Sequence, residues 1–329
     1  MKLISPEELV LEDLIKSCSC YFGFQVLETI PIKHGWLNLK WRLITDSGIF
    51  LLKQYNKERL RKYNHAELLF AFTQQMRLHR AGFPCPKLYS YNGQILLESN
   101  TGELFLLMEY CDGNMIPPGK LNSHQMYDLG RATGRMHQLL NDGSIVRKRT
   151  PVFSPSSKKE RLTHWKLVKS HLRDKGKTHL LPIIDTQYKT TENINFVNDH
   201  IGESGWAHRD LWVDNILFHD RELSAVLDFD RMKYDFPQLD VARAVISGAL
   251  YENKLDVFLV SVFVEGYREA RLFDKGCLLE SLKWLWYMES TWWIHAELDL
   301  QSGPSQRFSE EIQWLSENLT ELEFMLKEL

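Results

Sequence analysis

The chain has 329 residues, of which 44% are hydrophobic and 25% are charged, a composition typical of a folded globular protein with one large domain or two lobes. Its formal net charge is -3, whereas proteins that bind nucleic acids or membrane surfaces use a strong basic excess to attract phosphate groups. We therefore expect neither a nucleic-acid partner nor a membrane partner.

The cysteines and the N-terminus favour a cytoplasmic protein. The number of cysteines is odd, and only Cys18 and Cys20 lie close in sequence, so no disulfide framework is expected. Ser5, Pro6 and Glu8 match a helix N-cap, a first-turn proline and a capping-box glutamate, which predicts a helix over residues 6–22 rather than a signal peptide. No stretch approaches the roughly 20 apolar residues that span a bilayer.

An N-terminal lobe is predicted over residues 1–111. A helix is expected over residues 58–80, where Gly82, Pro84 and Pro86 follow and prevent its continuation. Around this helix, apolar runs separated by turn-forming residues predict an antiparallel sheet, with strands at residues 28–32, 39–44, 49–55, 94–98 and 104–109.

The remaining residues, 112–329, predict a larger and mainly helical lobe. The run Pro117-Pro118-Gly119 marks the boundary, and a helix follows over residues 123–140. Residues 142–159 are rich in polar residues and proline and are expected to form a surface excursion. Short strands are expected between residues 206 and 227, and only helix after Pro237. The predicted fold class is therefore α+β, with a small antiparallel-sheet lobe followed by a larger helical lobe.

The most informative segment runs from His208 to Asn215 and reads HRDLWVDN. It matches the catalytic-loop pattern of kinases, in which H-x-D is followed by four residues and then Asn. Asp228 follows at the end of the next strands. In this chemistry a carboxylate orients the acceptor hydroxyl, here Asp210, while an amide oxygen and a second carboxylate hold Mg²⁺ against the phosphates, here Asn215 and Asp228. Singly, each is more often a turn or strand-end residue, but their joint order favours catalysis.

A kinase also needs a strand lysine for the α- and β-phosphates of ATP and a helix glutamate that holds this lysine. Lys53 ends the apolar run of residues 49–52, and Glu67 lies on the next predicted helix. Alone, both residues are usually solvated. Their place before the catalytic loop, in the order strand, helix and loop, indicates that they bind the nucleotide.

These residues together resemble the aminoglycoside phosphotransferase and choline kinase superfamily, which shares the protein-kinase-like fold and includes homoserine kinase-like and spore-coat kinase-like members. The resemblance covers residues 28–249 and is strongest over residues 206–244. It implies that residues 106–111 form a hinge in which the backbone of Glu109 and Cys111 binds adenine, although a buried strand explains this segment as well. It also implies that Asn38, after a glycine-poor loop at residues 33–37, meets the phosphates, whereas a plain strand turn is the alternative.

Supporting roles follow from the same resemblance. Asp240 corresponds to an aspartate at a helix start that braces the catalytic loop, and an acidic residue there also suits the helix dipole. His208 and His137 are expected to pack and hydrogen-bond rather than carry protons. Asp230 supports the site from the acidic strand end.

The chain departs from the pattern in two places. Arg209 stands where many small-molecule members carry glycine. The resulting His-Arg-Asp sequence is the one found in protein kinases. However, Asp228-Phe229-Asp230 lacks the glycine of D-F-G, and no A-P-E sequence follows at a usable distance. We therefore expect a small-molecule hydroxyl acceptor rather than a protein.

The resemblance implies that the aromatic segment of residues 284–293 helps to form the acceptor pocket. Glu289 with Trp286 and Trp293 would hold an ammonium group by charge pairing and cation–π attraction, which suggests an amino alcohol or an amino sugar. Packing of these rings in a helical core is the alternative to this site and the explanation that the spacing of the rings favours. The catalytic segment also resembles that of homoserine kinase-like members, which implies a homoserine-like acceptor.

The sequence thus predicts an enzyme that uses ATP and Mg²⁺ to phosphorylate a hydroxyl of a small molecule. A binding or structural protein that keeps the kinase scaffold without turnover is the rival. The presence of candidates for all five polar residues, Lys53, Glu67, Asp210, Asn215 and Asp228, favours activity.

Overall fold

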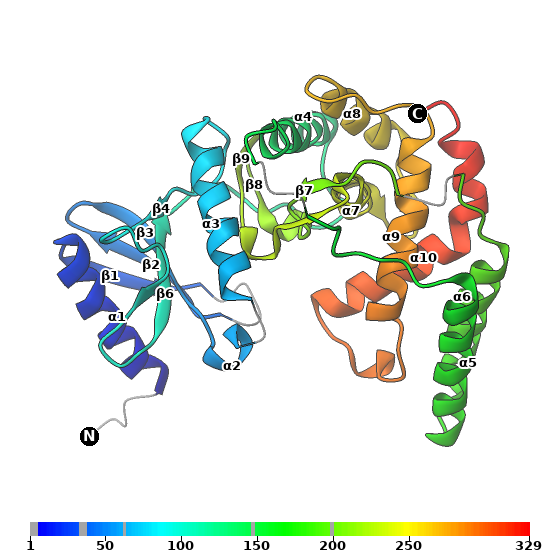
Figure 1. Ribbon diagram of the computed structural model, residues 1–329, viewed down its shortest axis with the longest axis horizontal. Helices are drawn as coiled ribbons and strands as arrows, with labels where there is room; N and C mark the ends of the chain where they lie inside the picture. The colour runs from blue at the N-terminus through cyan, green and yellow to red at the C-terminus, as the bar shows by residue number, and fades with distance from the viewer. Residues whose placement is uncertain (1–5, 33–37, 62–63, 146–148, 198–200) are drawn as a thin grey trace. The chain divides into compact units, whose positions relative to one another are not determined.

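The computed structural model describes residues 6–32, 38–61, 64–145, 149–197 and 201–329, and the chain divides into two compact units (Figure 1). Unit 1 contains residues 1–114 and 224–232, and unit 2 contains residues 115–223 and 233–329. The short segment 224–232 therefore returns to the first unit. It places Asp228 and Asp230 in the same unit as Lys53.

Unit 1 is built on an antiparallel sheet, as the sequence predicted. The strand order is β1-β2-β3-β6-β4, and β5 also pairs with β6. Lys53 near the end of β3 pairs with Lys40 of β2 on one side and with Leu106 of β6 on the other, so it lies in the interior of the sheet. The strands are β1 (Val26–Pro31), β2 (Lys40–Thr45), β3 (Gly48–Gln54), β4 (Leu88–Tyr89), β5 (Leu97–Glu98) and β6 (Leu104–Glu109).

Three helices accompany this sheet. The predicted N-terminal helix is α1 (Pro6–Phe22), whereas its expected N-cap, Ser5, lies outside the described residues. The single helix predicted over residues 58–80 is wrong: the structure has α2 (Lys57–Leu60) and α3 (His65–Arg80). The reason is a cap signal inside the apolar pattern, since the Asn64 side chain accepts hydrogen bonds from the first-turn N–H groups of α3.

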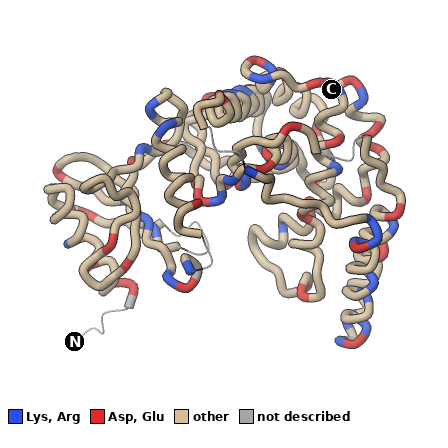
Figure 2. The backbone as a smooth tube through the Cα atoms, in the orientation of Figure 1, with Lys and Arg blue, Asp and Glu red and all other residues tan. Residues whose placement is uncertain are grey.

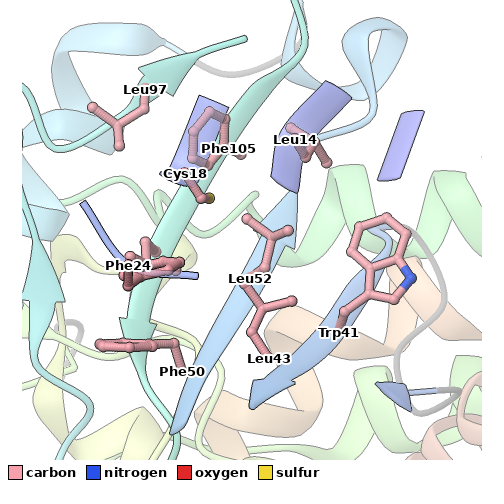
Figure 3. Close-up of a cluster of buried hydrophobic side chains, with 10 residues drawn as sticks. Leu14, Cys18, Phe24, Trp41, Leu43, Phe50, Leu52, Leu97 and Phe105 are labelled. Carbon is pink, nitrogen blue, oxygen red and sulfur yellow. The ribbon is translucent and has the colours of Figure 1, made fainter. Parts of the chain in front are cut away.

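The two faces of β3 pack on different cores. Phe50 and Leu52 join one cluster of buried side chains that includes residues of α1 (Figure 3). Leu51 and Tyr55 belong to a second cluster, which includes residues of α3. Because side chains alternate along a strand, Lys53 lies on the face shared with Leu51 and Tyr55. The strand period therefore directs this lysine toward the α3 side of the sheet.

Unit 2 is mainly helical. Its helices are α4 (Ser123–Leu140), α5 (Lys158–Asp174), α6 (Leu181–Asn193), α7 (Pro237–Ala249), α8 (Val257–Arg268), α9 (Cys277–Trp293) and α10 (Pro304–Met325). Helix α4 has the bounds that the sequence predicted. The predicted strands between residues 206 and 227 correspond to β7 (Gly205–Ala207), β8 (Ile216–His219) and β9 (Glu222–Val226).

Two short strands interrupt the C-terminal helices, so the expectation of helix throughout that region is wrong. Strands β11 (Leu250–Tyr251) and β12 (Lys254–Leu255) pair antiparallel. Glu252 and Asn253 connect them with φ values of 48° and 59°, the left-handed conformation that a tight hairpin turn requires. A second small ladder pairs β7 with β10 (Lys233–Asp235).

Helices α4 and α8 pack closely because both carry glycine where they cross. A Cβ atom added to Gly130 would lie 2.0 Å from the Phe263 carbonyl oxygen, and one added to Gly266 would lie 2.1 Å from the Tyr127 carbonyl oxygen. No side chain fits at either distance. The glycines thus permit the close backbone approach of α4 and α8.

Charged residues of both signs are distributed along the backbone of each unit (Figure 2). Among the described helices, none has the length and apolar composition needed to cross a membrane.

Candidate functional site

The Lys53 ammonium group in unit 1 is held between two carboxylates. Its side chain is 4% exposed, and Nζ donates to Asp228 Oδ1 at 3.0 Å and to Asp230 Oδ2 at 2.7 Å. Burial lowers the pKa of Lys53, but the two carboxylates raise it by more, so its pKa lies above the ordinary value. The lysine therefore stays positively charged at neutral pH.

The two aspartates differ in exposure and therefore in what they can do. Asp230 is buried, and Tyr55 donates its hydroxyl to Oδ1 at 2.9 Å, so both carboxylate oxygens have partners. Burial raises the pKa of Asp230, while Lys53 and Tyr55 oppose this rise. Asp228 is 27% exposed, and the Lys40 ammonium lies 4.0 Å from its Oδ2. Asp228 can thus reach a ligand from solution, whereas Asp230 anchors the lysine.

The backbone at Asp228 has φ 59° and ψ 67°, the left-handed region that costs a residue other than glycine free energy. The short 3-10 helix of Phe229–Arg231 follows directly and turns Asp230 back toward Lys53. Sequence reasoning missed Tyr55 and Lys40. The period-two alternation along β3 was the signal for Tyr55, because residues 53 and 55 share one face.

Two further residues predicted to bind nucleotide lie elsewhere in unit 1. Glu67 is half-buried in the first turn of α3, where its own N–H is capped by Asn64. Asn38 lies just before β2, and its Oδ1 accepts a hydrogen bond from the Asn56 N–H at 3.3 Å. The loop at residues 33–37 lies outside the described residues. The roles of Glu67 and Asn38 stay predictions.

The predicted hinge is strand β6 and the residues after it. The Glu109 N–H donates to the Lys87 carbonyl at 2.9 Å, so this N–H already has a partner within the sheet. Burial, followed by the charges of Glu109 and Asp112, raises the pKa of Cys111 to about 12, so its thiol stays protonated. The adenine contacts at both positions remain predictions.

The catalytic loop in unit 2 ties Asp210 to Asn215. The Asn215 Nδ2 donates to the Asp210 main-chain carbonyl at 2.8 Å and to its Oδ2 at 3.0 Å. Both N–H bonds of the amide are therefore directed at Asp210, and Oδ1 of Asn215 is the atom suited to a metal ion. Asp210 is half-buried, so its carboxylate is not sealed from solvent.

A buried aspartate holds the backbone of this loop. Asp240 at the start of α7 accepts from the His208 N–H at 2.6 Å and from the Arg209 N–H at 2.8 Å. Arg209 has φ 64°, a strained conformation that these hydrogen bonds help to maintain. Burial raises the pKa of Asp240, but the hydrogen bond from His137 and the nearby positive groups lower it by a larger amount. The pKa of Asp240 therefore lies below the ordinary value.

His137 lies beneath the loop, fully buried. Its Nε2 lies 3.1 Å from Asp240 Oδ2, and its Nδ1 lies 3.0 Å from the Tyr267 hydroxyl. Burial lowers the pKa of His137 by more than Asp240 raises it, so the ring is neutral at pH 7. This is the packing and hydrogen-bonding position that the sequence indicated for a core histidine.

The side chain of Arg209 joins the catalytic loop to two other elements. Its Nε lies 2.8 Å from Asp235 Oδ2 at the end of β10, and its Nη2 lies 3.0 Å from the Met288 sulfur on α9. Burial raises the pKa of Asp235, although Arg209 opposes the rise. The arginine at this position therefore has a structural partner of its own, which the sequence did not reveal.

The aromatic segment of α9 is largely core. Trp286 is fully buried and donates its indole N–H to the Gln187 side chain at 2.8 Å. Glu289 is also buried, pairs with the Arg243 guanidinium and accepts from the Trp293 indole at 3.0 Å. Its charge is therefore already matched by an arginine. This is the helix packing that was the alternative to an ammonium site, and the ammonium hypothesis gains no support from it.

Comparison with known proteins places this arrangement in a family. Residues 28–279 match the model of the phosphotransferase enzyme family (APH). A homoserine kinase of Bartonella henselae is 24% identical over 249 residues, which cover 73% of this chain and 71% of that protein. A homoserine kinase of Rhodopseudomonas palustris is 22% identical over 272 residues, which cover 80% and 77% of the two chains.

Solved structures agree on the fold. An amicoumacin kinase in complex with AMP-PNP, Ca²⁺ and its antibiotic has a TM-score of 0.59 at 20% identity, covering 94% of this chain and 93% of that chain. A choline kinase from Cryptosporidium parvum has a TM-score of 0.57 at 15% identity, covering 96% and 98%. The predictions of a kinase-like fold and of a small-molecule phosphotransferase are confirmed. The chain belongs to the phosphotransferase enzyme family.

Proposed function

We propose that this protein transfers the γ-phosphoryl group of ATP to a hydroxyl of a small molecule, with Mg²⁺ as the metal ion. One observation carries the proposal: the kinase signature residues form connected polar groups within each unit, Lys53 with Asp228 in unit 1 and Asp210 with Asn215 in unit 2. The relatives support it, since they include homoserine kinases and kinases solved with AMP-PNP or ADP.

In unit 1 the proposed task is to hold the triphosphate. The Lys53 ammonium would donate to the α- and β-phosphate oxygens, as the strand lysine of kinases does. Asp230, supported by Tyr55, would keep the Lys53 ammonium oriented when Asp228 binds the metal ion. Glu109 and Cys111 would contact adenine through a carbonyl oxygen and an N–H group.

In unit 2 the proposed task is to prepare the acceptor. The Asp210 carboxylate would accept the hydroxyl proton as the acceptor oxygen forms its bond to the γ-phosphorus and the bond to the β-phosphate oxygen breaks, which releases ADP. Asn215 keeps Asp210 oriented through its two N–H bonds. Asp240 fixes the loop from below. Alignment and charge neutralisation would supply most of the rate increase.

The chain's donor set fits Mg²⁺. This ion prefers oxygen ligands and is usually held by one or two carboxylates together with substrate phosphates. Asp228 offers an accessible carboxylate, and the amide geometry of Asn215 leaves its Oδ1 to bind metal. When bound, Mg²⁺ would neutralise charge on the β- and γ-phosphates.

A loss-of-function pair tests the proposal. Asp210→Asn should lower turnover by about 1,000-fold, because general-base catalysis contributes about 100- to 10,000-fold. Its melting temperature should still rise with Mg·ATP as in the wild type. Asp214→Asn is the matched control, since Asp214 lies in the same loop, is exposed and pairs with Arg307.

The measurement is acceptor-dependent ADP release across a panel of hydroxylated metabolites, including L-homoserine, amino alcohols and amino sugars. Undiminished turnover in Asp210→Asn would refute the catalytic role. If Mg·ATP does not raise the melting temperature of the wild-type protein and no acceptor causes ADP release, the protein would instead be a kinase-fold binding or structural protein.

A further inference from the structure

Arg161 on α5 is a buried cation without a carboxylate partner among the residues that the structure describes. It is 4% exposed, and its guanidinium donates from Nη1 to the Ser290 hydroxyl at 3.1 Å and from Nη2 to the Tyr287 carbonyl. Its Nε has no hydrogen-bond partner within the described part of the chain. A buried charge is costly unless it is paired, so this arginine lacks its expected counter-ion.

A second buried arginine in the same unit shows how a buried positive charge is usually neutralised. Arg243 is 3% exposed and pairs with two carboxylates, those of Glu289 and Glu311, the latter at 2.7 Å. Its Nε also lacks a hydrogen-bond partner in the described ranges, but its positive charge is matched by carboxylates, which Arg161 lacks. Arg161 receives only neutral acceptors from its described neighbours, so its surroundings suit an anion that comes from outside the chain.

The groups around Arg161 also suit an anion. His164, one turn along α5, has a buried Nε2 with no hydrogen-bond partner in the described ranges. Burial, followed by the charge of Arg161, lowers the pKa of His164, so the ring is neutral and can donate one N–H. The Arg161 guanidinium carbon lies 4.1 Å from the centre of the Tyr287 ring, and Phe196 and Trp284 adjoin that ring. Such apolar walls strengthen charge attraction.

This group is linked to the catalytic loop through α9. Tyr287 and Ser290, which hold Arg161, flank Met288, and the Met288 sulfur lies 3.0 Å from Arg209 Nη2. Arg209 directly precedes Asp210. The same turn of α9 therefore contacts both the unmatched arginine and the residue next to the proposed base.

We propose that Arg161, supported by Ser290 and His164, binds a carboxylate of the acceptor, so that the substrate is a hydroxy acid of the amino-acid type. This inference rests on the proposed function and restricts its acceptor from any small-molecule alcohol to one that carries a carboxylate. An arginine recognises a carboxylate through parallel N–H bonds, and Arg161 retains unused N–H groups for this purpose. An amino alcohol offers no such group.

The test compares acceptors that differ only in the carboxylate. L-Homoserine, L-serine and L-threonine are each assayed for ADP release against their decarboxylated counterparts, 3-aminopropan-1-ol, ethanolamine and 1-aminopropan-2-ol. The wild type should favour the best hydroxy amino acid over its counterpart by about 100-fold or more in kcat/KM, since an unpaired buried charge is costly. Arg161→Met should reduce that ratio to near one through a higher KM, with the KM for ATP unchanged.

Two further variants keep the result interpretable. Arg173→Met removes an exposed arginine from the same helix and should leave the ratio unchanged. Arg161→Lys keeps the positive charge but not the planar guanidinium, so it should give an intermediate ratio. This variant also provides the test if Arg161→Met does not fold. Binding of L-homoserine in the presence of AMP-PNP, measured by calorimetry, provides a readout that needs no turnover.

Three results would overturn the inference: a best acceptor without a carboxylate, an unchanged ratio in both Arg161 variants, or no binding and no turnover of any hydroxy acid. Each of these can occur while Mg·ATP still raises the melting temperature and another alcohol is phosphorylated. The proposed kinase function would then stand. Its own failure would appear as the loss of nucleotide binding or of ADP release with every acceptor.

Discussion

Replacing Asp230 by Asn tests whether the structure has identified the true counter-ion of Lys53. The change removes a buried charge at 2.7 Å from the ammonium but keeps the shape of the side chain. Losing the partner of a buried ion pair costs about 3–5 kcal/mol when nothing replaces it. Here Asp228 remains at 3.0 Å and Asn can still accept one hydrogen bond, so we expect about 1–3 kcal/mol.

Catalysis should suffer as well as stability. A lysine held only by the partly exposed Asp228 carboxylate is less well oriented toward the phosphates, so kcat/KM for ATP should fall by about 10- to 100-fold, which corresponds to about 1.4–2.8 kcal/mol. The assays are urea unfolding followed by tryptophan fluorescence and steady-state kinetics with ATP varied. Tyr55→Phe, which removes the hydroxyl donor to Asp230, should produce a smaller change in the same direction.

Glu67→Gln is the decisive comparison, because the sequence pattern names Glu67 as the partner of this lysine. If Asp230 anchors Lys53, Asp230→Asn should cost more than Glu67→Gln in both assays. The reasoning is refuted if Glu67→Gln abolishes activity while Asp230→Asn behaves as the wild type.

Three further perturbations follow from unit 2. Burial raises the pKa of Glu311 to about 7 in the folded protein, so the folded state binds its proton more tightly, and stability should fall as pH rises from about 4.5 to about 7, by up to about 3 kcal/mol. Glu311→Gln should flatten this part of the stability profile in urea unfolding at several pH values, and equal slopes in both proteins would contradict the assignment. Gly130→Ala should destabilise the fold by about 1–3 kcal/mol, because the new Cβ would lie 2.0 Å from the Phe263 carbonyl, and an unchanged melting temperature would show that α4 and α8 can separate without cost. Asp240→Asn should lower kcat by about 10- to 100-fold with little change in KM, since an amide leaves one buried loop N–H without an acceptor, and a kcat equal to that of the wild type would show that the loop needs no such brace.

Sequence alone was sufficient for features that depend on local pattern. Helix α4 was predicted with its observed bounds because a strong N-cap at Asn122 precedes an amphipathic run. Strands β1, β2, β3 and β6 of unit 1 were found by alternation and turn residues, whereas the two-residue strand β4 (Leu88–Tyr89) was not predicted. The order of Lys53, Asp210 and Asn215 along the chain was enough to indicate the family, since that order reflects the sequence in which kinase elements follow one another.

Tertiary structure decided the partners. Lys53 meets Asp230 across 177 positions of sequence, so no local pattern could show that this carboxylate, together with Tyr55, holds the lysine. The composition of α9 suggested an ammonium receptor, but Glu289 is neutralised by Arg243, which lies 46 positions earlier in the chain. The same holds for Arg161, which lacks a carboxylate partner among the described residues. Whether a buried charge is matched depends on which distant side chains fold around it, and only the folded chain specifies them.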